Sequence, residues 1–404
     1  MPINLNTVLK LAGTGNLELV EINARYDLAR AQHLKAKEWL IPTVSPGVLM
    51  SSYNGIIQDV EGNFLDVTKD GFWAGLQVTA NWDVGTAMYM SQAARQNVET
   101  AGHAKVVGQA RVNLGAVRSY YDLGAAQSKL VALEQAAKKS EDIVSQIDLQ
   151  VMQGISYKSD LLLAKAELNH IKITISKVRS EIHQRSNSLI ELLNIADNVQ
   201  LLVVDSLLVP VELVDSSIIS VEDAFNKRPE LLVLNSGLQG MQTARKSQTS
   251  GLLLPTVDFG LNNGPFGPYF SPEGNSFSYY VGARWDIPLG VLFYGGTRKE
   301  YDARIRIQEI NIDKTRNQIR REIHDEVAHV GGSRTRLELA QAAVRFASEA
   351  LEQGIQRQQL GTAIPLEVLR AQEQLVEAKL DLIDSVTQYN KAQYGLYIAL
   401  GNNP

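Results

Sequence analysis

The feature that most constrains the fold of this 404-residue chain is that it contains the same unit twice. The segment LIPTV, at residues 40–44, recurs as LLPTV at 253–257, and the pair Trp82-Asp83 recurs as Trp285-Asp286. Units of about 200 residues are far longer than solenoid repeats, so the pattern indicates a duplicated domain rather than an array. We predict a first repeat over 1–195, a linker over 196–220 and a second repeat over 221–404.

Both repeats show the same order of predicted elements: a helix, two strand segments, a very long helix and a last helix that follows a tight turn. The first repeat places them at 5–39, 43–84, 86–152 and 157–195, and the second at 221–252, 256–287, 296–359 and 365–400. Each long helix would extend over about 100 Å, so it requires a partner of similar length, which the returning helix can provide. Apolar runs in the linker predict short extended pieces.

The last helix of each repeat carries apolar residues at steps of three and four. In the first repeat these are Leu168, Ile171, Ile175, Val178, Ile182, Leu189 and Leu192, with Arg185 at the missing position. In the second repeat they are Leu375, Ala378, Leu382, Ser385, Tyr389, Ala392, Leu396 and Ala399. A sustained period of about 3.5 residues indicates left-handed coiled-coil packing.

The strand segments alternate between apolar and polar side chains. One face of the first repeat carries Phe72, Ala74, Leu76, Val78, Ala80 and Trp82, and one face of the second carries Phe277, Tyr279, Val281, Ala283, Trp285 and Ile287. Alternating segments of about ten residues with aromatic ends are typical of transmembrane β-barrels. A soluble sheet with one buried face shows the same alternation and is the alternative interpretation.

The number of strands decides what the membrane interpretation requires. Closed barrels need about eight strands or more, and four strands cannot close alone. An open sheet in lipid would leave unpaired edges, which the bilayer does not tolerate. Several chains would therefore have to share one barrel, and their long helices would surround a common axis.

The composition excludes several function classes. The chain has no cysteine, which rules out thiolate metal sites, thiol nucleophiles and disulfides. The formal net charge of −5 is spread along the chain, so no basic face favours a nucleic-acid partner. His324 and His329 are not spaced as zinc ligands on one helix face. We find no nucleophile–base grouping, and therefore expect no enzyme activity, cofactor or metal.

The N-terminal residues MPINLNTVLKLAGTG lack the basic start and apolar core of a signal peptide. No window reaches the roughly 18 consecutive apolar residues of a membrane helix. If the chain is exported, we expect this to be the form from which a signal peptide has been removed.

Three stretches carry a resemblance to a known family: LAGTGNLEL with LKAKEWLIPTV, AFNKRPELLVLNSGLQGMQTARKSQTSGLLLPTV, and QLGTAIPLEVLRAQEQLVEAKLDLIDSVTQYNKAQYGLYIALG. In this duplicated order the chain resembles the TolC-like outer-membrane efflux proteins, or outer membrane factors, over almost its whole length. The resemblance implies a mixed α/β membrane protein, with a long antiparallel α-helical barrel continuous with a transmembrane β-barrel of four strands per protomer. It implies a homotrimer in the bacterial outer membrane that extends into the periplasm.

Such proteins are passive exit ducts of tripartite efflux pumps or type I secretion systems. The implied partners are a periplasmic adaptor (membrane fusion) protein, an inner-membrane transporter and outer-membrane lipid. The cargo stays open. The rival interpretation is a non-membrane periplasmic coiled-coil adaptor or scaffold, although adaptors usually have one helical hairpin and this chain has two equivalent ones.

The resemblance also implies roles for residues at the turn before each last helix, where acidic rings narrow the tunnel. The alignment places Asp160 and Glu367 at ring positions and Arg370 where relatives often have a second acid. This departure suggests Glu367–Arg370 pairing between neighbouring chains. The alternative is that these charges are solvated at exposed helix starts, where acids favour the helix dipole. Gly154 and Gly361 are expected to form the turns, at the tips that contact the adaptor.

The repeated Trp-Asp pairs mark the end of the last strand in each repeat. On the membrane interpretation Trp82 and Trp285 lie at the lipid interface, which favours indole rings. Asp83 and Asp286 then face the lumen, where the barrel meets the tunnel.

Overall fold

The computed structural model describes residues 1–195, 199–204, 209–214, 219–268, 271–360 and 362–403. It divides into two compact units. The helical unit consists of Met1–Ala24, His103–Leu231 and Asp313–Pro404, and the sheet unit of Arg25–Gly102 and Leu232–Ile312. Both predicted repeats contribute to both units, and parts of the predicted linker, 196–198, 205–208 and 215–218, lie outside the described residues.

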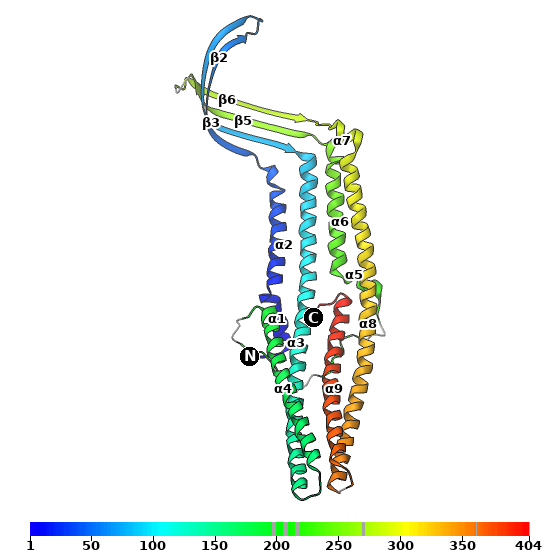
Figure 1. Cartoon of the computed structure of the whole chain (residues 1–404). Coiled ribbons are helices and arrows are strands. Elements are labelled where there is room, and N and C mark those ends of the chain that lie inside the picture. The colour runs from blue at the N-terminus through cyan, green and yellow to red at the C-terminus, as the bar shows by residue number, and fades with distance from the viewer. Residues whose placement is uncertain (196–198, 205–208, 215–218, 269–270, 361, 404) are drawn as a thin grey trace. The chain divides into compact units, whose positions relative to one another are not determined.

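The elements follow the predicted order in both halves of the chain (Figure 1). The first half contains β1 (Pro2–Ile3), α1 (Leu5–Gly15), α2 (Leu17–Lys35), η1 (Glu38–Leu40), β2 (Thr43–Gln58), β3 (Phe64–Asp83), α3 (Val84–Met152) and α4 (Lys158–Leu193). The second half contains β4 (Leu202–Val203), α5 (Val221–Lys227), α6 (Pro229–Ser247), η2 (Ser250–Leu253), β5 (Thr256–Gly267), β6 (Gly274–Arg284), α7 (Leu289–Tyr294), α8 (Gly296–Gln359) and α9 (Pro365–Ala399). None of the described helices combines the length and apolar character needed to cross a membrane.

The first helix of each half is divided where the sequence predicted one continuous helix. Asn16 takes an extended conformation after α1, and its side chain accepts a hydrogen bond of 3.2 Å from the Leu19 amide at the start of α2. In the second half Arg228 is extended, and Pro229 begins α6. Both breaks have a local cause, because Asn is a good N-cap and Pro is favoured at the first helical position.

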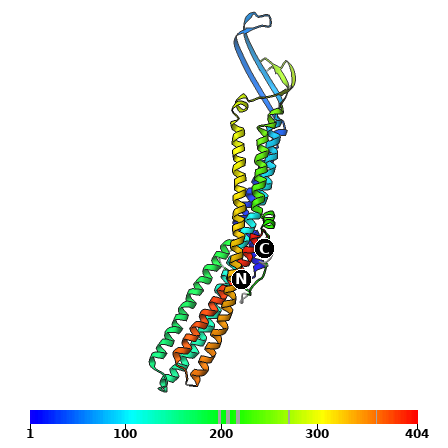
Figure 2. The ribbon, with the colours of Figure 1, turned by 90° about the vertical axis from the view of Figure 1, so that its right-hand side faces the viewer.

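The sheet unit contains one antiparallel sheet of four strands, in the order β2-β3-β5-β6. Its register keeps the predicted apolar residues together: Val44 lies opposite Val78, Val78 opposite Leu261, and Leu261 opposite Tyr279. The alternation that the sequence showed along each strand therefore continues across all four. The β2–β3 hairpin extends beyond β5, whose pairing with β3 reaches from Thr256 to Gly267 (Figures 1 and 2).

Segments of α3, α6 and α8 contact one another within the same unit. Thr100 of α3 donates a 2.9 Å hydrogen bond to Ser236 of α6, and Gln308 of α8 donates one of 2.9 Å to the Leu234 carbonyl of α6. Arg245 of α6 and Asp302 of α8 form an ion pair of 2.6 Å. Helix α6 therefore bridges the two long helices α3 and α8 in this unit.

The helical unit contains two hairpins, α3 with α4 and α8 with α9. The predicted coiled-coil spacing is confirmed in its central part, where Ile171, Ile175, Val178 and Ile182 are buried. Beyond it the packing shifts by one residue: Arg185 is exposed, and Ser186 is buried in its place and accepts a 3.1 Å hydrogen bond from the Leu201 amide. A second cluster near the hairpin turns contains Ile147, Leu161, Leu351 and Val368, one from each of the four helices.

Candidate functional sites

Much of the apolar face of the sheet is exposed in the described chain, above all on the edge strands β2 and β6. Seven of its side chains are exposed by between 42% and 70%, and they are Val44, Val48, Met50, Leu76, Phe277, Tyr279 and Val281. On the central strands, Val78, Trp82, Phe259 and Leu261 of the same face are partly buried. The alternative of a soluble sheet predicts burial of this face within the chain. An exposed apolar face of this kind is typical of a surface that contacts another molecule or a membrane.

The predicted junction residues of the first repeat end β3 as expected. Trp82 is the penultimate strand residue and stacks on Phe259 of β5, with ring centroids 6.4 Å apart. Asp83 is the last strand residue, and its carboxylate accepts a 3.0 Å hydrogen bond from the Thr86 amide in the first turn of α3. The Asp therefore has a local role, because it satisfies a free amide at a helix start.

The junction of the second repeat is built differently. Strand β6 ends at Arg284, and Trp285 lies just beyond it with 57% of its surface exposed. Arg284 forms ion pairs of 2.9 Å with Asp258 and with Asp286, and Asn81 donates to Asp258 at 2.6 Å. These side chains connect three strands on the polar face of the sheet.

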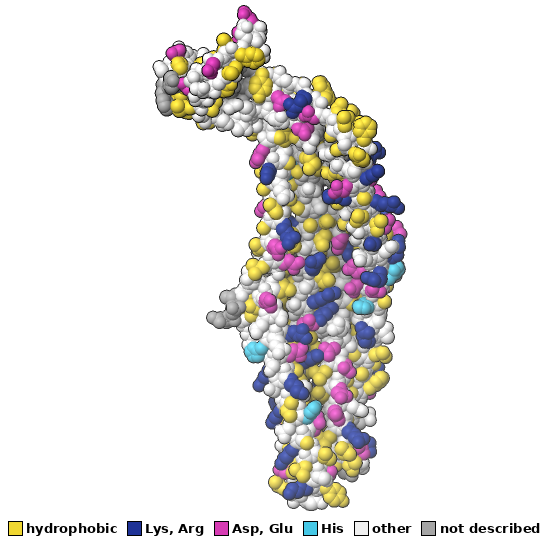
Figure 3. All heavy atoms as spheres, turned by 45° about the horizontal axis from the view of Figure 1, so that its top comes forward, with side chains coloured by type: hydrophobic (Ala, Val, Ile, Leu, Met, Phe, Trp, Pro, Cys, Tyr) yellow, Lys and Arg dark blue, Asp and Glu magenta, His cyan; other side chains and the backbone are white. Residues whose placement is uncertain are grey.

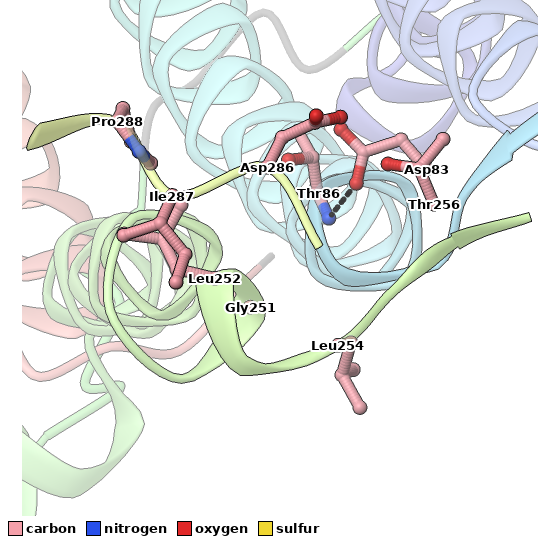
Figure 4. A pocket seen from close by; sticks show the side chains of 9 residues that line it. All are labelled: Asp83, Thr86, Gly251, Leu252, Leu254, Thr256, Asp286, Ile287 and Pro288. Carbon is pink, nitrogen blue, oxygen red and sulfur yellow. Dashed lines mark hydrogen bonds between the residues drawn. The ribbon is translucent and has the colours of Figure 1, made fainter. Parts of the chain in front are cut away.

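A cavity of about 350 Å³ lies where the strands meet the helices, and it contains both predicted Asp residues. In Figure 4, Asp83, Thr86 and Asp286 lie together on one side and Leu252 and Ile287 on the other. The backbones approach closely beside it, since a Cβ on Gly85 would lie 2.0 Å from the Gly251 carbonyl oxygen. Only glycine permits that approach.

The turn between α3 and α4 follows the predicted geometry. Gly154 has φ +76°, the left-handed conformation that commonly ends a helix. Asp160 lies in the first turn of α4 and accepts a long hydrogen bond of 3.4 Å from the Tyr157 amide. Asp160 thus caps its own helix.

The turn between α8 and α9 contains an ion pair that the sequence did not predict. The Glu367 carboxylate lies 3.4 Å from Arg357 near the end of α8, and Pro365 begins α9. Arg370 is exposed and forms no ion pair with a described residue of the chain. Gly361, the predicted turn residue, lies outside the described residues.

Large apolar side chains are exposed at both turns. The α3–α4 end carries Leu149, Met152, Ile155, Tyr157, Leu162 and Leu163, all at least 52% exposed, and the α8–α9 end carries Leu360 and Ile364, at 78% and 58%. Clustered apolar side chains at a helical end are typical of a protein-interaction surface.

Sequence reasoning missed a set of buried polar side chains that hold distant segments together. Asn390 of α9 exchanges hydrogen bonds of 2.9 Å with Val209 and Val211 of the linker, and Gln393 accepts from the Leu213 and Val214 amides at 3.1 Å. An Asn three residues before a Gln on a helix looks like an ordinary solvated pair. No local signal distinguishes it.

Glu326 of α8 is half-buried against α9, where Gly395 leaves room for its carboxylate. Burial raises the pKa of Glu326, and His329 and Arg118 oppose that rise. Among the described residues, no three His, Asp or Glu side chains are grouped to hold a metal ion. On the face that Figure 3 shows, charges of both signs are interspersed along the helices.

Comparison with known proteins agrees with this arrangement. Residues 221–402 match the family described as outer membrane efflux protein. No curated protein matches the chain.

Three solved structures illustrate the likeness in fold. A structure of CusC, described with conformational changes that accompany folding and transmembrane channel formation, has a TM-score of 0.83 at 19% identity, over 99% of this chain and 92% of that one. The outer membrane protein VceC of Vibrio cholerae has a TM-score of 0.81 at 16% identity, over 99% of this chain and 96% of that one. The MtrE outer membrane channel of Neisseria gonorrhoeae, in its open state, has a TM-score of 0.83 at 15% identity, over 98% of this chain and 89% of that one. At these identities the likeness is one of fold.

Proposed function

We propose that this chain belongs to the outer membrane efflux protein family, whose model matches residues 221–402, and that it is the exit duct of a tripartite efflux pump or a type I secretion system. The family consists of channel proteins of efflux systems and not of enzymes. On this proposal three copies share one barrel of twelve strands in the outer membrane, and their helices form a tunnel into the periplasm. The duct is passive, and an inner-membrane transporter supplies the energy.

One observation carries the proposal: apolar side chains lie in register across all four strands, and those on the edge strands β2 and β6 are largely exposed in the described chain. A bilayer can cover such a face without burying polar side chains. Moving apolar surface out of water contributes about 25 cal/mol per Å². The two open sheet edges also require partner strands if the sheet lies in lipid.

The polar face of the sheet would then line the lumen. Asp83, Asp258, Arg284 and Asp286 lie at its base, beside the first turn of α3. On the same proposal Trp82 and Trp285 lie at the lipid interface, where indoles are favoured.

The helix turns would form the periplasmic end. The exposed apolar side chains at both turns support a protein contact there, and the partner that this proposal requires is a periplasmic adaptor. Asp160, Glu367 and Arg370 would narrow the aperture. Within the chain, the Glu367 carboxylate is already paired with Arg357. On this proposal the charge of Glu367 at the aperture is therefore partly balanced by its own chain.

The experiment that tests the duct is fractionation followed by conductance. The protein should sediment with outer membranes, require detergent for extraction, migrate as a heat-modifiable trimer and form ion-conducting channels in planar bilayers. A chain that is soluble without detergent and monomeric would overturn the proposal and favour the adaptor or scaffold alternative.

The aperture is tested separately by the double substitution Glu367→Ala with Arg370→Ala. If these residues narrow the tunnel, single-channel conductance should rise relative to the wild type. The matched control is Glu349→Ala with Arg345→Ala, which removes one acid and one base from α8 away from the turn. Unchanged conductance in the aperture variant would exclude the aperture role without affecting the duct proposal.

A further inference from the structure

The β2–β3 hairpin extends beyond the rest of the sheet. Its strands pair continuously as far as Gln58 opposite Phe64, whereas the pairing of β3 with β5 ends at Phe72. Residues 51–58 and 64–71 therefore pair only with each other among the described strands, and we call this part the overhang. At about 3.3 Å per residue it extends roughly 26 Å beyond β5. It lies at the end of the sheet away from the helices, because β2 follows η1 and β3 leads into α3 (Figures 1 and 2).

The apolar face of the sheet stops where the overhang begins. Its last apolar pair on this hairpin is Met50 opposite Phe72. The next two pairs on the same face are polar, and they are Ser52 with Asp70 and Asn54 with Thr68. Nearer the tip, Asp66 lies on this face opposite Ile56. Charged side chains are disfavoured on the lipid face of a barrel, so this part of the hairpin is unsuited to hydrocarbon.

The opposite face of the hairpin becomes apolar toward the tip. The change begins at Leu49, which lies opposite Trp73, and Trp73 lies opposite Phe266 of β5. In the overhang this face, which we call the inner face, carries the pairs Tyr53–Lys69, Gly55–Val67 and Ile57–Leu65. Apolar side chains thus change from one face of the hairpin to the other at the level where β5 ends.

The overhang is held in shape by its own contacts. At the turn, the Asp59 carboxylate accepts hydrogen bonds of 3.0 and 2.8 Å from the amides of Glu61 and Asn63. On the inner face, Tyr53 donates a 3.0 Å hydrogen bond to the Ile56 carbonyl, and its ring lies beside Gly55. An aromatic ring over a strand glycine stabilises such a strand. The overhang is therefore a defined hairpin with two distinct faces.

The proposed duct determines what the inner face meets. This face lies on the same side of the sheet as Asp83 and Arg284, which the duct places toward the lumen. A barrel of twelve strands, spaced by about 4.8 Å and tilted by about 40°, has a backbone diameter of roughly 24 Å. An overhang of about 26 Å is longer than the barrel radius, so the overhangs of three copies can meet over the mouth.

We propose that the overhang is a gate at the outer mouth of the duct, in which the inner faces of three copies pack on one another over the lumen. This inference rests on the proposed trimeric duct. A ring of apolar side chains closes a pore to water and ions by dewetting. Two strands without a third are only marginally stable, so the overhangs can bend aside when cargo passes.

The gate is tested from outside the cell, because that readout does not depend on the periplasmic aperture. The chain has no cysteine, so Gln77→Cys, on the polar face below the overhang, provides a single reporter. In intact cells, Ile57→Ser with Leu65→Ser should make this cysteine react faster with a membrane-impermeant maleimide than it does without them. The two serines remove apolar side chains from the inner face and leave the four-stranded part unchanged.

The matched control is Ile56→Ser with Phe64→Ser in the same reporter chain. It removes two apolar side chains at neighbouring positions on the opposite face of the overhang. These side chains are 65% and 75% exposed, whereas Ile57 and Leu65 are 40% and 46% exposed. The control should label at the rate of the reporter alone.

A second measurement tests contact between copies. Leu65→Cys, oxidised in membranes with copper phenanthroline, should give a covalent dimer on a non-reducing gel, because inner faces of different copies meet. Asp66→Cys, the next residue on the opposite face, should give little or none.

The outcomes separate the gate from the duct. Faster labelling in the inner-face variant alone, together with dimers at position 65 and not at 66, supports the gate. Trimers in which both serine variants label at the rate of the reporter alone, or in which position 65 does not cross-link, overturn the gate and leave the duct intact. A chain that is monomeric in detergent overturns the proposed duct, and the gate with it.

Discussion

Each repeat has a joint at which the break in its first helix contacts the end of its last helix, and the two repeats build this joint from different side chains. In the first, Asn16 separates α1 from α2, and its amide donates a 2.8 Å hydrogen bond to the Leu192 carbonyl near the end of α4. In the second, Arg228 separates α5 from α6 and donates one of 3.1 Å to the Ala399 carbonyl at the end of α9. Leu192 and Ala399 occupy equivalent positions in the two repeats, as do Asn16 and Arg228.

The difference lies in charge. Arg228, whose side chain is only 7% exposed, also forms ion pairs of 3.0 Å with Glu230 and 2.6 Å with Glu322. Asn16 is neutral and instead caps α2 through the Leu19 amide. The duplication therefore preserved the backbone contact, because free carbonyls at a helix end require donors, but not the side chain that supplies it.

The largest expected effect is at the charged joint. Arg228→Met keeps an apolar stem but removes every hydrogen bond of the guanidinium, and should lower the free energy of unfolding by about 2 to 3 kcal/mol. Thermal or chemical unfolding of the detergent-extracted protein, followed by far-UV circular dichroism, measures the change. Arg245→Met, at a more exposed ion pair, is the matched control and should cost less. Equal losses in the two variants would contradict the special role of Arg228.

The neutral joint should be weaker. Asn16→Ala removes a cap and a donor and should cost about 1 kcal/mol. Asn16→Asp keeps the acceptor for the Leu19 amide but loses the donor to Leu192, so it separates the two contacts. If Asn16→Asp unfolds like the wild type, the contact to α4 contributes nothing measurable.

The first turn can be tested in the same way. Gly154→Ala should cost about 1 kcal/mol, because an L-residue is strained at its positive φ. A Cβ there would meet nothing within 4 Å, so the effect reports the backbone alone. Gly154→Asn should recover part of the loss, since Asn tolerates this conformation. An alanine variant as stable as the wild type would rule out strain at this turn.

Stability should depend on pH through Glu326 of α8, which is half-buried against α9. Burial raises the pKa of Glu326, one turn beyond Glu322, so the folded chain holds this proton more tightly than the unfolded chain. Its contribution to stability is therefore present at low pH and is lost as pH rises through the folded-state pKa. Glu326→Gln should be more stable than the wild type at pH values above the folded-state pKa of Glu326, and this advantage should shrink as the pH falls. If the difference in unfolding midpoint between Glu326→Gln and the wild type does not change with pH, the result would argue against burial of this charge.

The smallest effect is expected at the second turn. Arg357 and Glu367 are about half exposed, and exposed ion pairs contribute about 0.2 to 1 kcal/mol. Arg357→Ala should lower the unfolding midpoint slightly in low salt and less in high salt. Arg316→Ala, at another exposed pair on α8, is the control. A large loss that salt does not reduce would show that Arg357 has a further partner.

The elements that could be predicted from the sequence are those that depend on local periodicity. The long helix over 296–359 agrees with α8 residue for residue, and the seam from Ile171 to Ile182 is buried as expected. The seam was wrong at Arg185 because Ser186 hydrogen-bonds to the linker near β4, a partner from outside the repeat pattern. The breaks at Asn16 and Arg228 were missed because apolar periodicity continues through them.

Of the candidate site residues, Gly154 has the predicted left-handed conformation, and Asp83 ends its strand as predicted. The partners of these residues could not be predicted. Glu367 contacts Arg357, which precedes the turn, and Asp83 caps α3. Such contacts depend on how the backbone turns. A turn of a few residues has no repeating apolar pattern from which its conformation could be predicted. The roles of Asp160, Glu367 and Arg370 at an aperture stay predictions.

By itself the sequence determined the duplication, the order of helices and strands, and the two faces of each strand, because these depend on spacing along the chain. Only the tertiary structure decided which strands are neighbours, which edges stay open and that the apolar face is largely exposed on the edge strands. Those properties depend on the register between strands and on which elements pack against the sheet. They are decided by residues far apart in the chain, as when Trp82 meets Val257.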